Sequence, residues 1–582
     1  MTSRREVVLA AVMAVAPVIL TFLVLSLTST SFTVSTSVSP PGPQLSDAAA
    51  RQNAFRIFNT VLSALRQWDS SIHHNGMSFM LTTAPAGQPL YHGSRSAHAY
   101  QSITGEGFDW LAFEIEHAQC FAQSRGDVAE TGEAEEGDQG DDNPAASSRH
   151  PLREGRMKRT SGRSLNQDRW KRAAQDTGSQ HIFGNGDADA SRHPIPPSRG
   201  YLHTYRPARA LKLLYIDGMA ASKSPLGTLD TQDLVLLGPD PDHVHVHGDM
   251  KRARGLCALL DDWAAAADPV QLDGFLRMEA GFEVLLCQFR PDGPLERVSV
   301  RGSPFTNETA GDHRDMERRL YFEWLRAAAQ RYAGFPAGRL GLDWGSMVSL
   351  FSYDVDLANP DRSRPDLPRA VGVSDVESRV LRERMRQVAL ERSGHQGEGI
   401  RTGAVDWQGI ADLIVSRYAG RLVTLAAASA VASRSLVDVT MDPYLDYLDG
   451  GSAAHLVERC TKQFLDPALL QRGVWTPEDR SIYVALETVT GEICSTFAKL
   501  RHLLHGTGSV EQDLLAGVVH KEATGLMARL SWAIWRRCGR CPAPDEECLV
   551  VMFPWGDRED YFSPKCRSAA DLELDHDGSY WE

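Results

Sequence analysis

The chain has 582 residues, of which 42% are apolar and 23% carry a formal charge, and its formal net charge is −14. This composition is typical of a globular protein with a hydrophobic core, and the length fits two to four domains. Nonspecific nucleic-acid binding needs a basic surface that neutralises phosphates, so the negative charge argues against a nucleic-acid partner.

The N-terminus carries a strong targeting signal. Residues 7–27 are 21 consecutive uncharged residues, which as a helix are long enough to cross a bilayer. Arg4 and Arg5 precede this run, and the next formal charge is Asp47. Because cationic flanks stay in the cytoplasm, we expect a single-pass signal anchor with the bulk of the chain luminal or extracellular. The alternative is a cleaved signal peptide, which gives a secreted protein and places the bulk in the same compartment.

Changes in composition divide the chain further. Residues 28–45 are rich in Ser, Thr and Pro, and residues 124–200 have too few large apolar residues to fold alone. The expected parts are a cytoplasmic N-terminus (1–6), a transmembrane signal anchor (7–27), a stem (28–45), the first part of an α+β domain (46–123), a disordered charged insertion (124–200), the rest of that domain (201–374), an α-helical domain (375–537) and a Cys-rich C-terminal extension (538–582).

Hydrophobic periodicity predicts the elements in chain order. Ser46 caps an amphipathic helix that reaches Trp68. The expected buried strands are 210–216, 282–289 and 347–353, with helices at 255–267 and 316–332 between them. After Asp375 the expected helices are 376–392, 407–433, 479–504 and 510–537. The predicted fold class is therefore an α+β luminal region followed by a mainly α-helical region, behind one N-terminal transmembrane helix.

The charged insertion contains two basic tetrads that end at Arg159 and Arg172. Both resemble the Arg-x-Lys-Arg sites of subtilisin-like processing proteases, although a basic loop also produces such tetrads by chance. If cleavage occurs, a disulfide from Cys120 is one way to keep the two fragments joined.

Three short segments are candidates for a nucleotide-binding site. Residues 90–94 read Leu-Tyr-His-Gly-Ser, residues 110–113 read Trp-Leu-Ala-Phe, and residues 281–283 read Gly-Phe-Glu. This order resembles the ADP-ribosyltransferase superfamily. The resemblance implies NAD as the cofactor and His92 as a residue that binds it. Tyr91 or Phe113 would flank the nicotinamide ring. Glu279 or Glu283 would polarise the ribose hydroxyl. The structural alternative for Glu283 is a buried acid paired with an arginine.

Two other patterns are candidate metal sites. Asp354 and Asp356 follow an apolar strand and resemble the Asp-x-Asp metal–nucleotide site of luminal type II glycosyltransferases. The alternative is turn chemistry, in which the acids cap the following turn. His243, His245 and His247 lie on one face of an extended chain and are able to bind Zn²⁺ or Cu²⁺, unless they form a flexible histidine tract.

The predicted compartment determines how the cysteines and one sequon are interpreted. Four cysteines cluster at the C-terminal end, namely Cys538, Cys541, Cys548 and Cys566. In a reducing compartment they would suggest a zinc knuckle, but a luminal location favours two disulfides, whose pairing is open. Asn307 begins an N-glycosylation sequon, so we expect a glycoprotein if the topology is right.

Taken whole, the chain resembles an uncharacterised group of fungal membrane-anchored proteins. The resemblance rests on Asp217-Gly218-Met219, on residues 277–283 and on the Cys-rich end. It implies no activity. The leading interpretation is a secretory-pathway protein of unassigned biochemistry, bound to the membrane by its N-terminal helix and with a binding or scaffold role for a protein partner left open. The enzyme alternatives are an ADP-ribosyltransferase-like enzyme that uses NAD, and a glycosyltransferase.

Overall fold

The computed structural model describes residues 42–100, 107–122, 199–238, 248–306, 313–336, 338–393, 405–446, 448, 453–506, 512–572 and 580–581. The predicted anchor at residues 7–27 lies outside these ranges, as does almost all of the predicted insertion. Within the described ranges, no helix has the length and apolar character that a membrane span requires. The chain divides into two units, Met1–Gly42 and Pro43–Glu582, and every element below belongs to the second unit.

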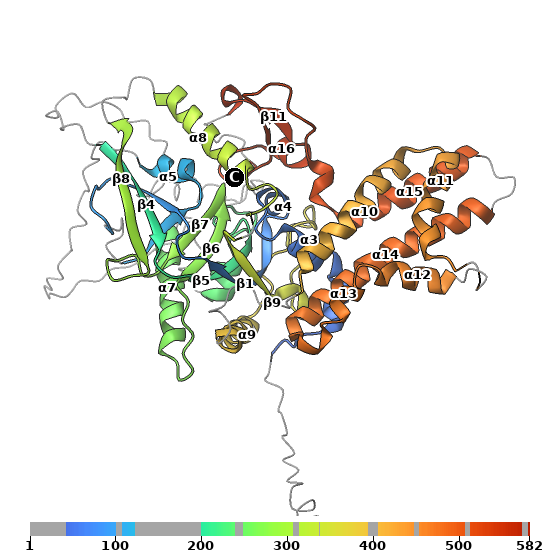
Figure 1. Ribbon diagram of the computed structural model, residues 1–582, viewed down its shortest axis with the longest axis horizontal. Helices are drawn as coiled ribbons and strands as arrows, with labels where there is room; N and C mark the ends of the chain where they lie inside the picture. The colour runs from blue at the N-terminus through green and yellow to red at the C-terminus, as the bar shows by residue number, and fades with distance from the viewer. Residues whose placement is uncertain are drawn as a thin grey trace, which may run out of the picture. The chain divides into compact units, whose positions relative to one another are not determined.

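A large mixed sheet forms the α+β part of the chain (Figure 1). Its strands are β1 (Asn75–Ala84), β2 (Leu90–Ser94), β3 (Asp109–Ala112), β4 (Arg199–Pro207), β5 (Leu211–Gly218), β6 (Gly274–Glu279), β7 (Gly281–Leu286), β8 (Leu295–Thr306) and β9 (Gly341–Ser349). Their spatial order is β8-β4-β2-β3-β7-β6-β5-β1-β9. Neighbouring strands are antiparallel except β5 and β6, which are parallel.

The centre of the sheet is buried on both faces. Every residue of β6 and β7 is buried, and so is every residue of β5 except Lys212. Such near-continuous apolar runs are expected for strands that are covered on both sides. The predicted strands at 210–216 and 282–289 correspond to β5 and β7. The predicted strand at 347–353 overlaps β9 only at the last three residues of β9, because a short 3-10 helix (Leu350–Ser352) follows Ser349. β9 also begins earlier than expected, at Gly341, because its polar start pairs with the end of β1.

The N-terminal helices differ from the expected single helix. Ser46 accepts hydrogen bonds from Ala48 N and Ala49 N and caps the first of them, as predicted. The segment then breaks into α2 (Asp47–Gln52), α3 (Ala54–Ser63) and α4 (Gln67–Ile72). Leu65 has a φ of 58°, a left-handed conformation that ends a helix. The other helices of this part are α5 (Ile115–Phe121), α7 (Asp249–Ala265) and α8 (His313–Ala329).

The C-terminal region is mainly helical, which confirms the predicted order of an α+β part and then a helical part. Its helices are α9 (Asp375–Ser393), α10 (Trp407–Ala427), α11 (Ala430–Met441), α12 (Ala453–Lys462), α13 (Asp466–Leu469), α14 (Pro477–Gly506), α15 (Gln512–Leu530) and α16 (Arg558–Phe562). In Figure 1 the helices α10, α11, α12, α14 and α15 form a bundle on one side of the sheet, and α14 also packs against β9. The short strands β10 (Glu547–Leu549) and β11 (Lys565–Arg567) pair near the chain end.

Four disulfides link eight of the nine cysteines. Cys538 pairs with Cys548 and Cys541 with Cys566, so the predicted C-terminal disulfides are confirmed and their pairing is resolved. Two further bridges, Cys257–Cys287 and Cys460–Cys494, were not predicted. Cys120 is buried and belongs to none of the four, and its thiol lies 3.3 Å from the Glu116 carbonyl oxygen. The suggested disulfide from Cys120 is therefore wrong.

Candidate functional site

The candidate site is built on the hairpin of β6 and β7. Arg277 on β6 is the register partner of Glu283 on β7, and Glu279 is paired with Gly281 at the turn. Because side chains alternate between the faces of a strand, Arg277, Glu279 and Glu283 share one face of the sheet. The Arg277 guanidinium donates two hydrogen bonds to Glu283 Oε1, at 3.1 and 2.6 Å, so Glu283 is the buried acid paired with an arginine that the sequence left open.

The turn of this hairpin is fixed by a side-chain amide from α4. Gln67 Nε2 donates to the carbonyl oxygen of Glu279 at 3.0 Å, and its Oε1 accepts from Gly281 N at 3.0 Å. Gly281 has a φ of 110°, a conformation that favours glycine. The backbone that carries Glu279 and Glu283 is thus held by buried hydrogen bonds on both sides of Ala280.

His117 reaches the same face from α5. Its ring stacks on the Trp324 indole with centroids 4.4 Å apart and an interplanar angle of 17°. Trp324 in turn donates its indole N–H to the Ala280 carbonyl oxygen. His117 is 2% exposed, and its Nδ1 is buried with no hydrogen-bond partner in the described part of the chain. Burial, and secondarily the charge of Lys223, lowers the pKa of His117 to about 3, so its imidazole is neutral at physiological pH.

A lysine and a second acid complete the group. Lys223 follows β5, and its Nζ lies 3.6 Å from Asp249 Oδ2 and 3.9 Å from Glu279 Oε1. Asp249 begins α7 and also accepts from Arg277 at 3.4 Å. We use "the charged cluster" for six residues, which are His117, Lys223, Asp249, Arg277, Glu279 and Glu283.

The cluster changes the ionisation of its members in opposite directions. Burial raises the pKa of Glu279 to about 7, and the attraction of Lys223 only partly offsets this. Burial would also raise the pKa of Asp249, but Lys223, Arg277 and Arg252 together lower it well below its usual range. Asp249 is therefore a permanent anion, whereas Glu279 is close to its midpoint at neutral pH.

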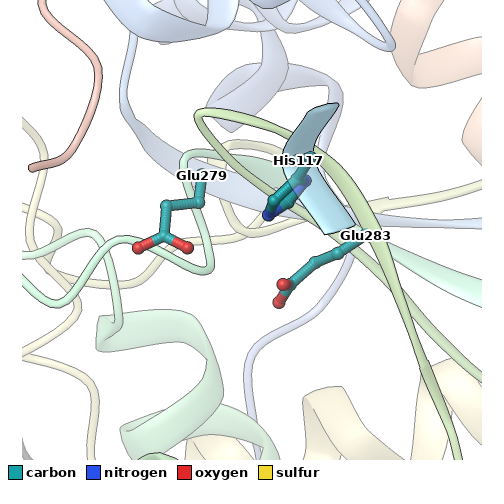
Figure 2. A group of neighbouring side chains, drawn as sticks. All are labelled: His117, Glu279 and Glu283. Carbon is teal, nitrogen blue, oxygen red and sulfur yellow. The ribbon is translucent and has the colours of Figure 1, made fainter. Parts of the chain in front are cut away.

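Three members of the cluster are arranged like metal ligands (Figure 2). One ligand atom from each of His117, Glu279 and Glu283 lies within 4.8 Å of the other two, and all three residues are buried. In Figure 2 the His117 imidazole and the carboxylates of Glu279 and Glu283 lie around a common space. Across the described ranges this is the one group of three or more His, Cys, Asp or Glu residues with such spacing.

The structure separates the residues that the transferase resemblance grouped. Tyr91 is the register partner of Ala112, and Ala112 is the partner of Glu283, so Tyr91 and Glu283 share a face of the sheet. His92 follows Tyr91 and therefore points to the opposite face. Its Nδ1 lies 2.9 Å from the Trp110 carbonyl oxygen, and its ring packs 5.2 Å from Phe289.

The aromatic residue proposed to flank nicotinamide lies elsewhere in the core. The buried Phe113 ring contacts Phe335, with centroids 5.0 Å apart, and Phe335 also contacts Phe282. Of the predicted transferase residues, the structure brings Glu279 and Glu283 together but turns the His92 ring away from them.

The two acids of the Asp-x-Asp pattern are exposed. Asp356 Oδ1 accepts a hydrogen bond from Ala358 N at 3.0 Å. In the same way, the Oδ1 atoms of Asn359 and Asp361 each accept from the backbone N–H two residues later. This is the turn chemistry that the sequence offered as the alternative for Asp356.

The other predicted sites lie outside the described residues. They are the histidines His243, His245 and His247, the sequon asparagine Asn307, and the processing sites Arg159 and Arg172.

Sequence reasoning missed His117, Lys223 and Asp249. His117 is a single histidine in a short helix, and neither Lys223 nor Asp249 belongs to a motif with a known spacing. The one local signal for any of the three is that Lys223 follows shortly after a buried strand that ends in Asp-Gly, and this signal is weak. The three residues meet the glutamates only because β5 and β6 are neighbours and α5 covers the same face.

Comparison with known proteins gives a family match and two relatives. Residues 47–311 match the family model described as the YPL277C N-terminal domain. Two proteins of Saccharomyces cerevisiae, "Uncharacterized protein YPL277C" and "Uncharacterized protein YOR389W", are 30% and 29% identical over 253 residues.

These alignments cover 43% of this chain, and 43% and 33% of the two relatives, respectively. No solved structure matches. All six residues of the charged cluster lie within residues 47–311. These matches support an uncharacterised fungal family over the part of the chain that carries the candidate site.

Proposed function

We propose that this chain is a membrane-anchored protein of the secretory pathway, with most of its residues in the luminal or extracellular space. The observation that carries the proposal is the pairing of eight cysteines in four disulfides, which persist in oxidising compartments and are rare in the cytosol. The uncharged run at residues 7–27, with Arg4 and Arg5 before it, supplies the anchor and the orientation.

This proposal is tested with the full chain, tagged at its C-terminus and expressed in a fungal host. We expect it in the membrane pellet after carbonate extraction, with a mobility shift after removal of N-glycans. Asn307→Gln should abolish the shift. Release into the medium would favour the secreted alternative, and a cytosolic, unglycosylated protein with free thiols would contradict the proposal.

Within this protein, we place the biochemical activity in the charged cluster.

The two enzyme alternatives need other arrangements. An NAD-using transferase needs His92 in one cleft with Glu279 or Glu283, and a glycosyltransferase needs a metal at Asp354 and Asp356. Calorimetric titration with NAD, and with nucleotide sugars plus Mn²⁺, tests both alternatives directly. Binding that is lost in His92→Ala or in Asp356→Asn would restore the corresponding alternative.

A further inference from the structure

Three buried side chains of the charged cluster, those of His117, Glu279 and Glu283, have metal-binding atoms. Arg277 pairs with Glu283, but His117 and Glu279 have fewer close partners than such groups usually have. The buried Glu279 carboxylate lies 3.9 Å from Lys223 Nζ, which is beyond hydrogen-bond distance. His117 is 2% exposed, and its Nδ1 has no hydrogen-bond partner in the described ranges. Buried polar atoms normally have a hydrogen-bond partner or a bound ion, so a ligand between these side chains would explain their arrangement.

We propose that His117, Glu279 and Glu283 bind one divalent transition-metal ion, of the Zn²⁺ or Mn²⁺ type. Their ligand atoms lie within 4.8 Å of one another, so that an ion between them reaches all three at about 2.0–2.3 Å with small side-chain movements. The inference adds a cofactor to the protein, and it does not depend on the membrane anchor proposed above.

The surroundings hold each ligand in place, as metal sites require. The Trp324 indole stacks on the His117 ring, and Gln67 fixes the backbone at Glu279. Arg277 binds Glu283 through Oε1 alone, so Oε2 is not engaged by this arginine. Such second contacts orient ligands and limit their loss of entropy on binding.

The donor set selects the class of ion. Ca²⁺ and Mg²⁺ prefer oxygen ligands alone, whereas an imidazole with two carboxylates suits Zn²⁺, Mn²⁺ or Fe²⁺. A neutral imidazole has the free electron pair that a metal needs.

Charge also favours a cation at this position. When Glu279 is ionised, the four anions Asp233, Asp249, Glu279 and Glu283 outnumber the three cations Lys223, Arg252 and Arg277, so a bound cation stabilises the ionised form of Glu279. The competing explanation is that Lys223 alone neutralises Glu279.

The test is metal titration of the full chain, purified in detergent and treated with a chelator. Zn²⁺ and Mn²⁺ are added separately, the affinity is measured by calorimetry, and the bound ion is counted by elemental mass spectrometry. Because the tract at His243, His245 and His247 is a second candidate for metal binding, the titration is repeated with all three changed to alanine. We expect one ion per chain in both proteins.

Four single variants then locate the ion. His117→Gln and Glu279→Gln should each weaken binding at least about tenfold. His203→Gln and Glu478→Gln, which change a buried histidine and a buried glutamate outside the cluster, should retain the affinity of the unaltered protein. Every variant must keep its disulfides and its melting cooperativity. If His117→Gln does not fold, Glu279→Gln decides the question. The proposal is overturned if the triple-alanine protein binds no ion, or if Glu279→Gln binds the ion as tightly as the parent.

Discussion

At the scale of single residues, burial controls protonation well beyond the charged cluster. Asp217, the penultimate residue of β5, is 4% exposed, and its Oδ1 has no hydrogen-bond partner in the described part of the chain. Burial raises the pKa of this carboxyl from 3.8 to about 7, against hydrogen bonds from Gly218 and Thr60 that lower it. The folded protein therefore holds this proton more tightly than the unfolded chain does. The stabilisation is complete below pH about 4 and is lost as the pH rises through about 7.

Asp217→Asn should remove this pH dependence. The free energy of unfolding of the variant, relative to the unaltered protein, should increase between pH 4.5 and pH 7.5, by roughly 1.4 kcal/mol per pKa unit of the shift. Urea unfolding at several pH values measures the difference. Asp47→Asn is the matched control, because the Arg480 hydrogen bond lowers the pKa of the half-buried Asp47 and its effect should be constant above pH 5. A constant difference for Asp217→Asn as well would contradict the prediction.

Gln67 is predicted to act on the site through the backbone. Gln67→Ala leaves the Glu279 carbonyl and the Gly281 N–H without their buried partner, which costs about 1–3 kcal/mol for each group in unfolding free energy. The variant should also bind the proposed metal ion more weakly, because Glu279 is no longer fixed.

Gln408→Ala is the control for Gln67→Ala. The Gln408 amide donates to Val61 O and Ala64 O, and neither acceptor belongs to the cluster or to the β6–β7 hairpin. Both variants should be destabilised, but only Gln67→Ala should lose metal affinity. Equal metal affinity in the two would show that the hairpin turn does not position the ligand.

At the scale of elements, two central strands were predicted well from the sequence, and one break between helices was missed. The apolar runs of β5 and β7 identified both strands, because burial on two faces leaves a continuous signal in the sequence. The predicted helix at 407–433 is instead two helices, α10 and α11, which are separated at Ala428 and Ser429. No Gly or Pro marks the break. Ser429 accepts a hydrogen bond from Ala432 N and caps α11, and serine in an alanine-rich stretch is a weak cue.

The helical region is predicted to depend on its own disulfide. Cys460 on α12 and Cys494 on α14 are both 0% exposed, and they close a loop across a sequence separation of 34. Changing both to serine should lower the free energy of unfolding by about 2–4 kcal/mol, because the unfolded chain gains freedom. Denaturant unfolding of the oxidised proteins measures the loss. Cys120→Ser is the control, since Cys120 belongs to none of the four disulfides, and a similar loss in both variants would contradict the prediction.

At the scale of the whole molecule, the candidate site shows what local patterns miss. Glu279 and Glu283 were named from the sequence as alternatives for one role, which the transferase resemblance implied. His117, Lys223 and Asp249 come from α5, from the segment after β5 and from the start of α7, and they meet the glutamates through the strand order β3-β7-β6-β5. That order is set by long-range pairing, which periodicity does not report. His92 shows the converse, because a motif that looked functional points to the other face of the sheet.

The location of the chain determines how its cysteines, its sequon and its metal supply are interpreted. The most direct measurement is protease protection of sealed vesicles from cells that express the full chain with a C-terminal tag. If most of the chain is luminal, the C-terminal tag and the disulfide-bonded part of the chain stay undigested until detergent is added. Complete digestion of the tag without detergent, in vesicles that still protect a luminal marker, would contradict the proposed topology.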